Sequence, residues 1–230
     1  MQFDNYLALE DTLTMPIEDI ISKHKTYKLQ RFTKRLIDVC VSFLVIVFIL
    51  SWVIPLFAII SKLDSKGSIF FLQPRIGIGN RIFLCWKLRT MYQDSDTQSF
   101  KATELKDNRV TKLGSFLRKT NIDELPQIVN VFLGDMTLVG PRPQAIPFHQ
   151  EYKGYIKDID LRHVVKPGIT GYAQIRGLRG DSTNIEENKR RICKRFECDM
   201  WYIENWSLML DLEILIKTLF LIIKGDDNAL

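Results

Sequence analysis

Two adjacent carboxylates, Asp123 and Glu124, are the side chains of this sequence best suited to chemistry at phosphorus. They precede a helical pattern of apolar residues at 125, 128, 129 and 132, with Pro126 in its first turn. Acids at a helix start are commonly capping residues, and spacing alone does not separate that role from catalysis. The N–H groups of a helix start also bind phosphate, and Arg118 and Lys119 lie just upstream. An aspartate in such a field can attack phosphorus when a metal and cations neutralise the phosphate oxygens, and the glutamate could bind that metal.

A second candidate is Arg142, which stands between two prolines in the segment 140–143. Because proline fixes φ, both neighbours of the arginine are restrained, and less entropy is lost when its guanidinium binds an anion. A rigid surface turn is the alternative interpretation. The residues alone leave both interpretations open.

Three other patterns carry weaker signals. Asp94-Ser95-Asp96 resembles the Asp-x-Asp metal motif of soluble glycosyltransferases, but it stands in a polar segment without a preceding strand. Gly77 and Gly79 lack the third glycine of a dinucleotide-binding loop and instead indicate a hairpin turn. The four cysteines and three histidines show no zinc-binding spacing, which favours free thiols in a reducing compartment over a structural metal.

Residues 39–60 carry no charge over 22 positions, enough for a helix of about 33 Å, which would cross a bilayer core of about 30 Å. Ser51 and Pro55 interrupt this run and predict a bend. Lys and Arg flank the run on both sides, whereas a spanning helix usually has a one-sided excess. We therefore expect a bent, re-entrant helix with both ends at the cytoplasmic face, and a plain single span is the alternative.

The remaining segments predict a mostly α-helical fold with one small β-hairpin. Residues 68–73 and 81–89 are the two strands, joined by a turn at 77–80, and period two places Lys87 and Arg89 on one face. A charged helix is expected at 186–205 and an apolar helix, interfacial or core, at 208–223. The predicted organisation is a polar lead-in at 1–33, the membrane helix at 34–62, a compact catalytic domain on the cytoplasmic face at 63–224, and a tail at 225–230.

Together these blocks resemble the bacterial polyprenyl-phosphate sugar phosphotransferases, also called monotopic phosphoglycosyl transferases. The resemblance covers about residues 34–224, which is nearly all of the chain after its lead-in. It rests on ordered segments at 34–38, 70–77, 87–91, 123–127, 130–143, 166–174 and 199–211. The sequence departs from the family where Ser51 is followed by Trp52 rather than proline, and where Tyr172 replaces a tryptophan.

The resemblance implies a two-step reaction. Asp123 would attack the sugar-linked phosphate of a UDP-sugar, release UMP and form a phosphosugar-enzyme intermediate. Undecaprenyl phosphate would then accept the sugar phosphate, which starts surface polysaccharide or glycan assembly. The resemblance also implies Mg²⁺ held by Asp123 and Glu124, and an inner-membrane location. It implies no nucleic-acid partner, and it leaves a homo-oligomer open. By the same resemblance the residues expected to contact substrate or line the site are Lys87, Arg89, Arg118, Arg142 and Asp199.

Two competing functions remain at this stage. One is a non-catalytic membrane-anchored regulator or scaffold of a glycan pathway, against which the intact Asp123-Glu124 pair and its basic neighbours argue. The other is a conventional glycosyltransferase that uses Asp94 and Asp96 and releases UDP. The positive net charge of +5 indicates anionic partners and does not separate the three.

Overall fold

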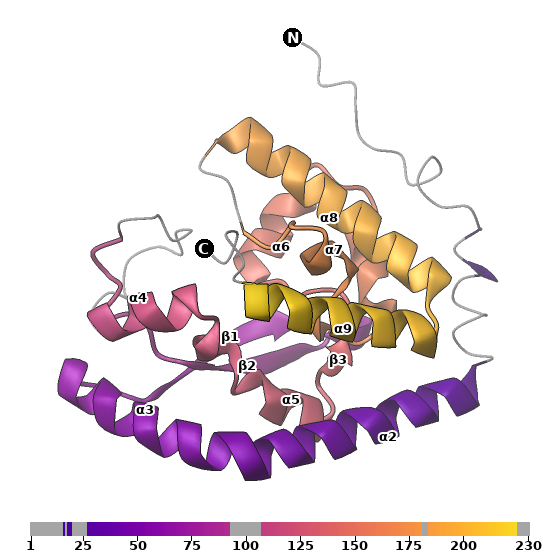
Figure 1. The fold of residues 1–230 in the computed structure, drawn as a ribbon. Helices are drawn as coiled ribbons and strands as arrows, with labels where there is room; N and C mark the ends of the chain where they lie inside the picture. The colour runs from indigo at the N-terminus through magenta and orange to yellow at the C-terminus, as the bar shows by residue number, and fades with distance from the viewer. Residues whose placement is uncertain (1–15, 17, 20–26, 93–106, 181–183, 225–230) are drawn as a thin grey trace.

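A computed structural model describes residues 16, 18–19, 27–92, 107–180 and 184–224. Its described parts are mostly helical, with two small two-stranded sheets. One long helix runs along the base of the molecule, and the other helices and the strands lie together on one side of it (Figure 1). The predicted mostly α-helical fold is therefore confirmed. Asp94 and Asp96 lie outside the described residues, as do most of the lead-in and the tail at 225–230.

The long helix consists of α2 (Lys28–Val45), a π-helical turn (Ile46–Leu50) and α3 (Ser51–Asp64). By length and composition it is the one helix of the described residues that could cross a membrane, and its most apolar stretch is only 6% buried. The π-helical turn lies immediately before Ser51, whose hydroxyl donates to the carbonyl of Val47, and Pro55 follows inside α3. Irregular turns and proline are recognised causes of helix bending, and the helix is bowed in Figure 1.

The predicted hairpin is confirmed. Strand β1 (Phe70–Ile76) pairs antiparallel with β2 (Ile82–Leu88), and a 3-10 turn (Ile78–Asn80) joins them. Gly79 and Asn80 both have φ near +60°, at 62° and 61°, a conformation that glycine and asparagine adopt most readily. Lys87 stands opposite Phe71 within the pair, whereas Arg89 follows the end of β2.

The segment after the hairpin consists of short elements. They are α4 (Lys112–Lys119), a 3-10 turn (Ile122–Glu124), α5 (Gln127–Leu133), β3 (Thr137–Val139), α6 (Ile146–Tyr152), a second 3-10 helix (Ile159–Val164), β4 (Gly168–Thr170) and α7 (Tyr172–Ile175). Strands β3 and β4 pair in parallel, which the sequence analysis did not predict. A Cβ on Gly168 would lie 2.1 Å from the backbone nitrogen of Gly140, so this pairing requires glycine.

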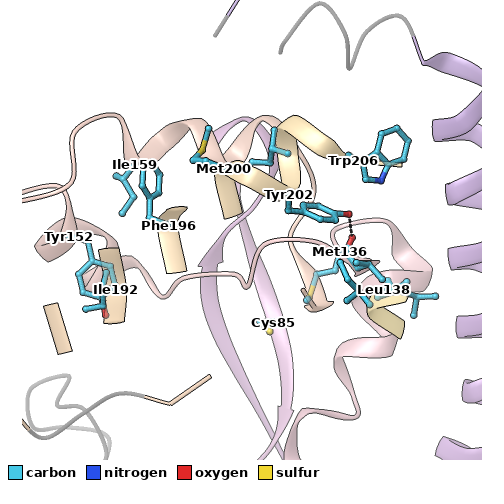
Figure 2. Close-up of a cluster of buried hydrophobic side chains, with 14 of the residues drawn as sticks. Cys85, Met136, Leu138, Tyr152, Ile159, Ile192, Phe196, Met200, Tyr202 and Trp206 are labelled. Carbon is cyan, nitrogen blue, oxygen red and sulfur yellow. Dashed lines mark hydrogen bonds between the residues drawn. The ribbon is translucent and has the colours of Figure 1, made fainter. Parts of the chain in front are cut away.

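Two long helices complete the fold, α8 (Ile185–Asn205) and α9 (Leu208–Lys224), within a residue or two of the predicted ranges. Their buried residues Met200, Ile203 and Ile214 pack with Met136 and Val131 into the core (Figure 2). The opposite face of α9 is exposed and apolar, with side chains Met209, Leu212, Ile216, Leu219, Phe220 and Ile222. Helix α9 is thus a core helix on one face and suits a membrane interface on the other.

Polar contacts fix the long helix to this body. The carboxylate of Asp38 accepts hydrogen bonds from the Thr137 hydroxyl at 2.8 Å and the Leu138 N–H at 3.0 Å. One turn earlier, Lys34 contacts the carboxylate of Asp211 on α9 and donates to the carbonyl of Val139 at 2.9 Å. Because these partners are about one hundred residues or more apart in sequence, the contacts hold α2 against β3 and α9.

Candidate active site

Asp123 and Glu124 lie in a 3-10 turn that leads into α5, as the helix-start pattern predicted. Asn121 reverses the chain before them with φ 56°, a left-handed conformation that asparagine tolerates better than most residues. Pro126 occupies the N-cap position of α5, where its missing N–H costs least. The turn directs both carboxylates inward, since Asp123 is 8% exposed and Glu124 7%.

Glu124 accepts hydrogen bonds from three cationic side chains. Lys87 Nζ lies 2.8 Å from Oε1, and Arg142 binds both oxygens, at 2.6 Å and 3.0 Å. Arg179 Nη2 lies 3.4 Å from Oε2. Burial by itself raises the pKa of Glu124, but the charges of Arg142 and Lys87 outweigh it and hold that pKa well below its usual range. Glu124 is therefore an ionised carboxylate fully engaged by cations.

Asp123 stands beside this cluster in a different state. Among the residues that the structure describes, none donates a hydrogen bond to its carboxylate. Burial raises the pKa of Asp123, the nearby Lys87 opposes that shift, and the charge of Glu124 adds to it. An ionised aspartate there keeps its lone pairs available and is destabilised by its surroundings, which suits a nucleophile or a metal ligand.

Arg142 is positioned by a rigid backbone loop, as the two prolines predicted. The N–H of Gly140 donates to Thr170 at 2.9 Å, the N–H of Gly168 donates to Pro141 at 2.9 Å, and buried Arg75 donates to the carbonyl of Pro143. These bonds fix the backbone on both sides of Arg142, whose guanidinium forms a two-point contact with Glu124. The anion that Arg142 binds in the structure is thus the carboxylate of the neighbouring turn.

Arg118 approaches Asp123 from the last turn of α4. Its Nε donates to the hydroxyl of Thr90 at 2.8 Å, and its charge is close enough to lower the pKa of Asp123. Helix α4 packs closely against Thr90, which follows the end of β2. A Cβ on Gly114 would lie 2.0 Å from the carbonyl oxygen of Thr90. Lys87, Arg118 and Arg142 thus lie around the acid pair, and their contact with substrate stays a prediction.

Two other candidates lie away from the pair. Arg89 donates to the carbonyls of Lys66 at 2.5 Å and Ser65 at 3.0 Å, so it fastens the end of α3 to the hairpin. Asp199 on α8 is buried with Arg162, whose Nη2 lies 2.5 Å from its Oδ2. Burial raises the pKa of Asp199 to about 6, and the charges of Arg162 and Arg195 oppose that shift. Arg162 also donates to the carbonyl of Arg142 at 2.9 Å, so Asp199 lies one layer behind the site.

Sequence reasoning missed Arg179, Arg162 and Arg75. Arg179 follows Gly177, which has φ 75°, and Arg191 on α8 holds that segment by donating to the carbonyls of Gly177 at 3.2 Å and Gly180 at 3.3 Å. Arginine between closely spaced glycines was the available signal for Arg179. The other two reach the site through tertiary contacts that have no local pattern.

Comparison with known proteins identifies the family of this chain. The family model described as bacterial sugar transferase matches residues 29–225. The chain is 44% identical over 188 residues to a Klebsiella pneumoniae protein named UDP-glucose:undecaprenyl-phosphate glucose-1-phosphate transferase, covering 81% of this chain and 39% of that protein. An Escherichia coli K12 protein of the same name is 41% identical over 191 residues, covering 83% of this chain and 40% of that protein.

A third relative differs in the sugar that its name gives. It is the Aeromonas hydrophila UDP-N-acetylgalactosamine-undecaprenyl-phosphate N-acetylgalactosaminephosphotransferase, 41% identical over 179 residues, with 75% of this chain and 41% of that protein covered. The chain thus spans about two fifths of the length of these three relatives. The family match extends from the long helix through the acid pair to the end of α9. The chain belongs to the bacterial sugar transferase family.

Proposed function

We propose that the protein transfers a sugar phosphate from a UDP-sugar to undecaprenyl phosphate, releases UMP, and so initiates assembly of a surface polysaccharide or glycan. The observation that carries this proposal is that the two adjacent buried acids differ in their hydrogen-bond partners. Glu124 is neutralised by three cationic side chains, whereas Asp123 has no donor among the described residues. The names of the relatives, which include UDP-glucose and undecaprenyl phosphate, support the choice of substrates.

In the proposed first step an oxygen of the Asp123 carboxylate attacks the sugar-linked phosphorus of the UDP-sugar. The bond from that phosphorus to the bridging oxygen of the diphosphate breaks, and UMP leaves with the electron pair. An acyl phosphate joins the sugar phosphate to Asp123. In the second step an oxygen of the lipid phosphate attacks the same phosphorus, the acyl phosphate bond breaks, and the carboxylate is restored. The first step exchanges a diphosphate for a mixed carboxylic–phosphoric anhydride and the second step does the reverse, so one anhydride replaces another throughout and neither step is strongly uphill.

The cations around Glu124 suit this reaction because they are already gathered where phosphate charge would develop. Lys87 and Arg142 contact Glu124, and Arg118 lies close to Asp123. A diphosphate that enters the site can share these donors with Glu124, since lysine offers three N–H groups and arginine five. In this arrangement Glu124 holds the cations in place, and the cations neutralise the charge of the phosphate that Asp123 attacks.

We further propose Mg²⁺ as the cofactor, held by Asp123 and Glu124. The buried Asp123 carboxylate, which lacks a donor among the described residues, fits a cation, and Mg²⁺ is commonly bound by one or two carboxylates together with substrate phosphates. When bound, it would neutralise phosphate oxygens during transfer. Both oxygens of Glu124 are bonded to cationic side chains in the structure, so Glu124 would join Asp123 in holding the ion only after one of these bonds opened.

We propose that the long helix enters the inner membrane without crossing it, with the site at the cytoplasmic face. The bend at the π-helical turn and the basic residues on both flanks support this topology. The exposed apolar face of α9 suits the same interface. Such a placement would bring a water-soluble donor and a lipid acceptor to one site.

The test is release of nucleotide by the purified full chain with Mg²⁺, undecaprenyl phosphate and a panel of UDP-sugars. The proposal expects UMP with at least one sugar, and loss of UMP with Asp123→Asn but not with Glu186→Gln, an exposed acid on α8. Release of UDP would instead favour a conventional glycosyltransferase. Absence of any release across the panel would favour a scaffold and overturn the proposal.

A further inference from the structure

Two histidines that are far apart in sequence meet in the fold. His149 lies on α6, and His163 lies with Asp160 on the 3-10 helix Ile159–Val164. His149 Nε2 is 2.8 Å and His163 Nδ1 is 3.8 Å from Asp160 Oδ1. One possible ligand atom from each of the three residues lies within 4.8 Å of the others. Both imidazoles are buried, whereas Asp160 is partly exposed. The spacing of the cysteines and histidines in the sequence showed no metal site. The fold nevertheless brings these two histidines and Asp160 into one cluster.

The oxygens around these rings outnumber the protons that neutral imidazoles carry. His149 Nδ1 lies 3.1 Å from Gln144 Oε1 while its Nε2 faces Asp160, and His163 Nδ1 lies 2.5 Å from Asn80 Oδ1. A neutral imidazole has one N–H, so it cannot donate in both directions, and without a metal ion the amides of Gln144 and Asn80 would turn to donate to the remaining ring nitrogens. Burial lowers the pKa of both histidines, which disfavours a second proton. A metal ion on His149 Nε2, with Nδ1–H donated to Gln144, satisfies that ring, and His163 would exchange its contact with Asn80 for the ion at Nδ1.

We infer that His149, His163 and Asp160 form a binding site for a transition-metal ion of the Zn²⁺ class, with water as the remaining ligand on the exposed side. Two imidazoles and one carboxylate are typical zinc ligands, whereas Mg²⁺ prefers oxygen ligands alone. Ligand atoms of tetrahedral zinc lie about 3.3 Å apart, so small side-chain rotations complete the geometry. Lys153 binds the other oxygen of Asp160 at 2.8 Å and leaves Oδ1 directed at the imidazoles.

The metal site lies apart from the acid pair and has a structural role. Its ligands come from α6 and the 3-10 helix, Asn80 belongs to the hairpin turn, and Gln144 directly follows Pro143 in the loop that carries Arg142. A metal ion there joins segments behind the Arg142 loop and stabilises their packing. It takes no part in transfer of the sugar phosphate, so the inference does not rest on the proposed function.

The test is titration of the metal-stripped full chain with Zn²⁺ alone, followed by calorimetry and by thermal unfolding. We expect one site per chain, a higher melting temperature with Zn²⁺, and binding weakened at least about 100-fold by His163→Gln and by Asp160→Asn. Asp158→Asn is the matched control, because Asp158 is exposed, lies two residues away, and has φ 58°, which asparagine accommodates.

Three results would overturn the inference: no Zn²⁺ binding to the wild-type chain, equal affinity in Asp160→Asn and the control, or displacement of Zn²⁺ by excess Mg²⁺. Titration with Co²⁺ adds a spectroscopic check, since the spectrum of a site with two histidines and an aspartate lacks thiolate charge-transfer bands. A thiolate spectrum would place the metal on cysteine and reject this site. If His163→Gln fails to fold, Asp160→Asn decides the question, because that carboxylate is partly exposed.

Discussion

Two of the buried acidic centres in the described part of the chain are built in opposite ways. At the junction of α2, α8 and α9, Asp211 receives a contact from Lys34, a hydrogen bond from the Tyr202 hydroxyl at 2.6 Å and one from Trp206 Nε1 at 3.1 Å. At the start of α5, Glu124 is equally well satisfied, but Asp123 beside it has no donor among the described residues. A satisfied carboxylate joins elements together, whereas an unsatisfied one retains reactivity that the fold must offset elsewhere.

The largest expected effect of breaking this contrast is at Asp123. Asp123→Asn should reduce UMP release by at least about 10³-fold, because an amide cannot serve as the nucleophile. The melting temperature should stay the same or rise, since the change removes a buried charge that has no donor among the described residues. Steady-state UMP release and thermal unfolding measure the two effects. A variant that loses activity only in proportion to lost folding would contradict the assignment.

At Asp211 we expect the opposite effect, which is a loss of stability. Asp211→Ala should lower the free energy of unfolding by about 3 kcal/mol, because Lys34 and Tyr202 lose the carboxylate that they share in a mostly buried site. Denaturant unfolding in detergent measures this change. Glu213→Gln, at an exposed position on the same helix, should change stability by no more than about 0.5 kcal/mol. If Asp211→Ala lowered the free energy of unfolding no more than Glu213→Gln does, the Asp211 carboxylate would not join these helices. Its contrast with Asp123 would then fail.

A smaller effect is expected when the two-point contact of Arg142 is reduced to one. Arg142→Lys keeps the charge but loses the fork that binds both oxygens of Glu124. We expect kcat/KM for the UDP-sugar to fall about 10-fold to 100-fold, with little change in melting temperature. Arg35→Lys is the comparison variant, because Arg35 donates to the backbone carbonyls of Val131 and Phe132 and is not among the residues expected to contact substrate. A similar loss of kcat/KM in both variants would argue against a specific role for Arg142.

The smallest expected effect is a displacement of the acid limb of the pH profile. Burial raises the pKa of Asp123, so activity should fall as pH decreases through that raised pKa and the carboxylate becomes protonated. The charge of Arg118 lowers the same pKa, so Arg118→Gln should move the acid limb to higher pH. UMP release across a pH series measures the midpoint. A midpoint that is unchanged or moves to lower pH would contradict the electrostatic account of Asp123.

The pKa shifts of Asp123 and Glu124 also set the direction in which stability changes with pH. Folding favours the protonated form of Asp123, so the stabilising contribution of its protonation is present at low pH and is lost as pH rises through the folded-state pKa. Glu124 has the opposite sign. Its pKa is lowered, so its contribution is present at neutral pH and is lost on acidification. Two adjacent acids therefore respond to pH in opposite directions.

Local patterns predicted most of the secondary structure. The hairpin and both C-terminal helices lie close to their expected ranges, because each has a clear period and clear ends. The long helix exceeds its expected range of 34–62 in both directions, from Lys28 to Asp64. Its charged first half is held by tertiary contacts, such as the bond from Arg35 to the carbonyl of Val131 at 2.6 Å, which leave no periodic signal.

The missed features depend on contacts between distant segments. Strands β3 and β4 are three residues long each and pair through close approach of Gly140 and Gly168, so neither has a strand pattern of its own. At the site, the adjacent acids and the proline-flanked Arg142 could be found locally. Arg162 and the pair of His149 and His163 could not, because folding alone brings them to their partners.

The most direct test of the central claim is a search for the covalent intermediate. The full chain would be incubated with Mg²⁺ and UDP-glucose or UDP-N-acetylgalactosamine without a lipid acceptor, then analysed by mass spectrometry and by UMP burst. The account predicts up to one UMP per chain and a phosphosugar adduct on Asp123, which disappears when undecaprenyl phosphate is added. With a donor that supports turnover, UMP release only in the presence of both substrates, with no adduct on Asp123, would contradict it.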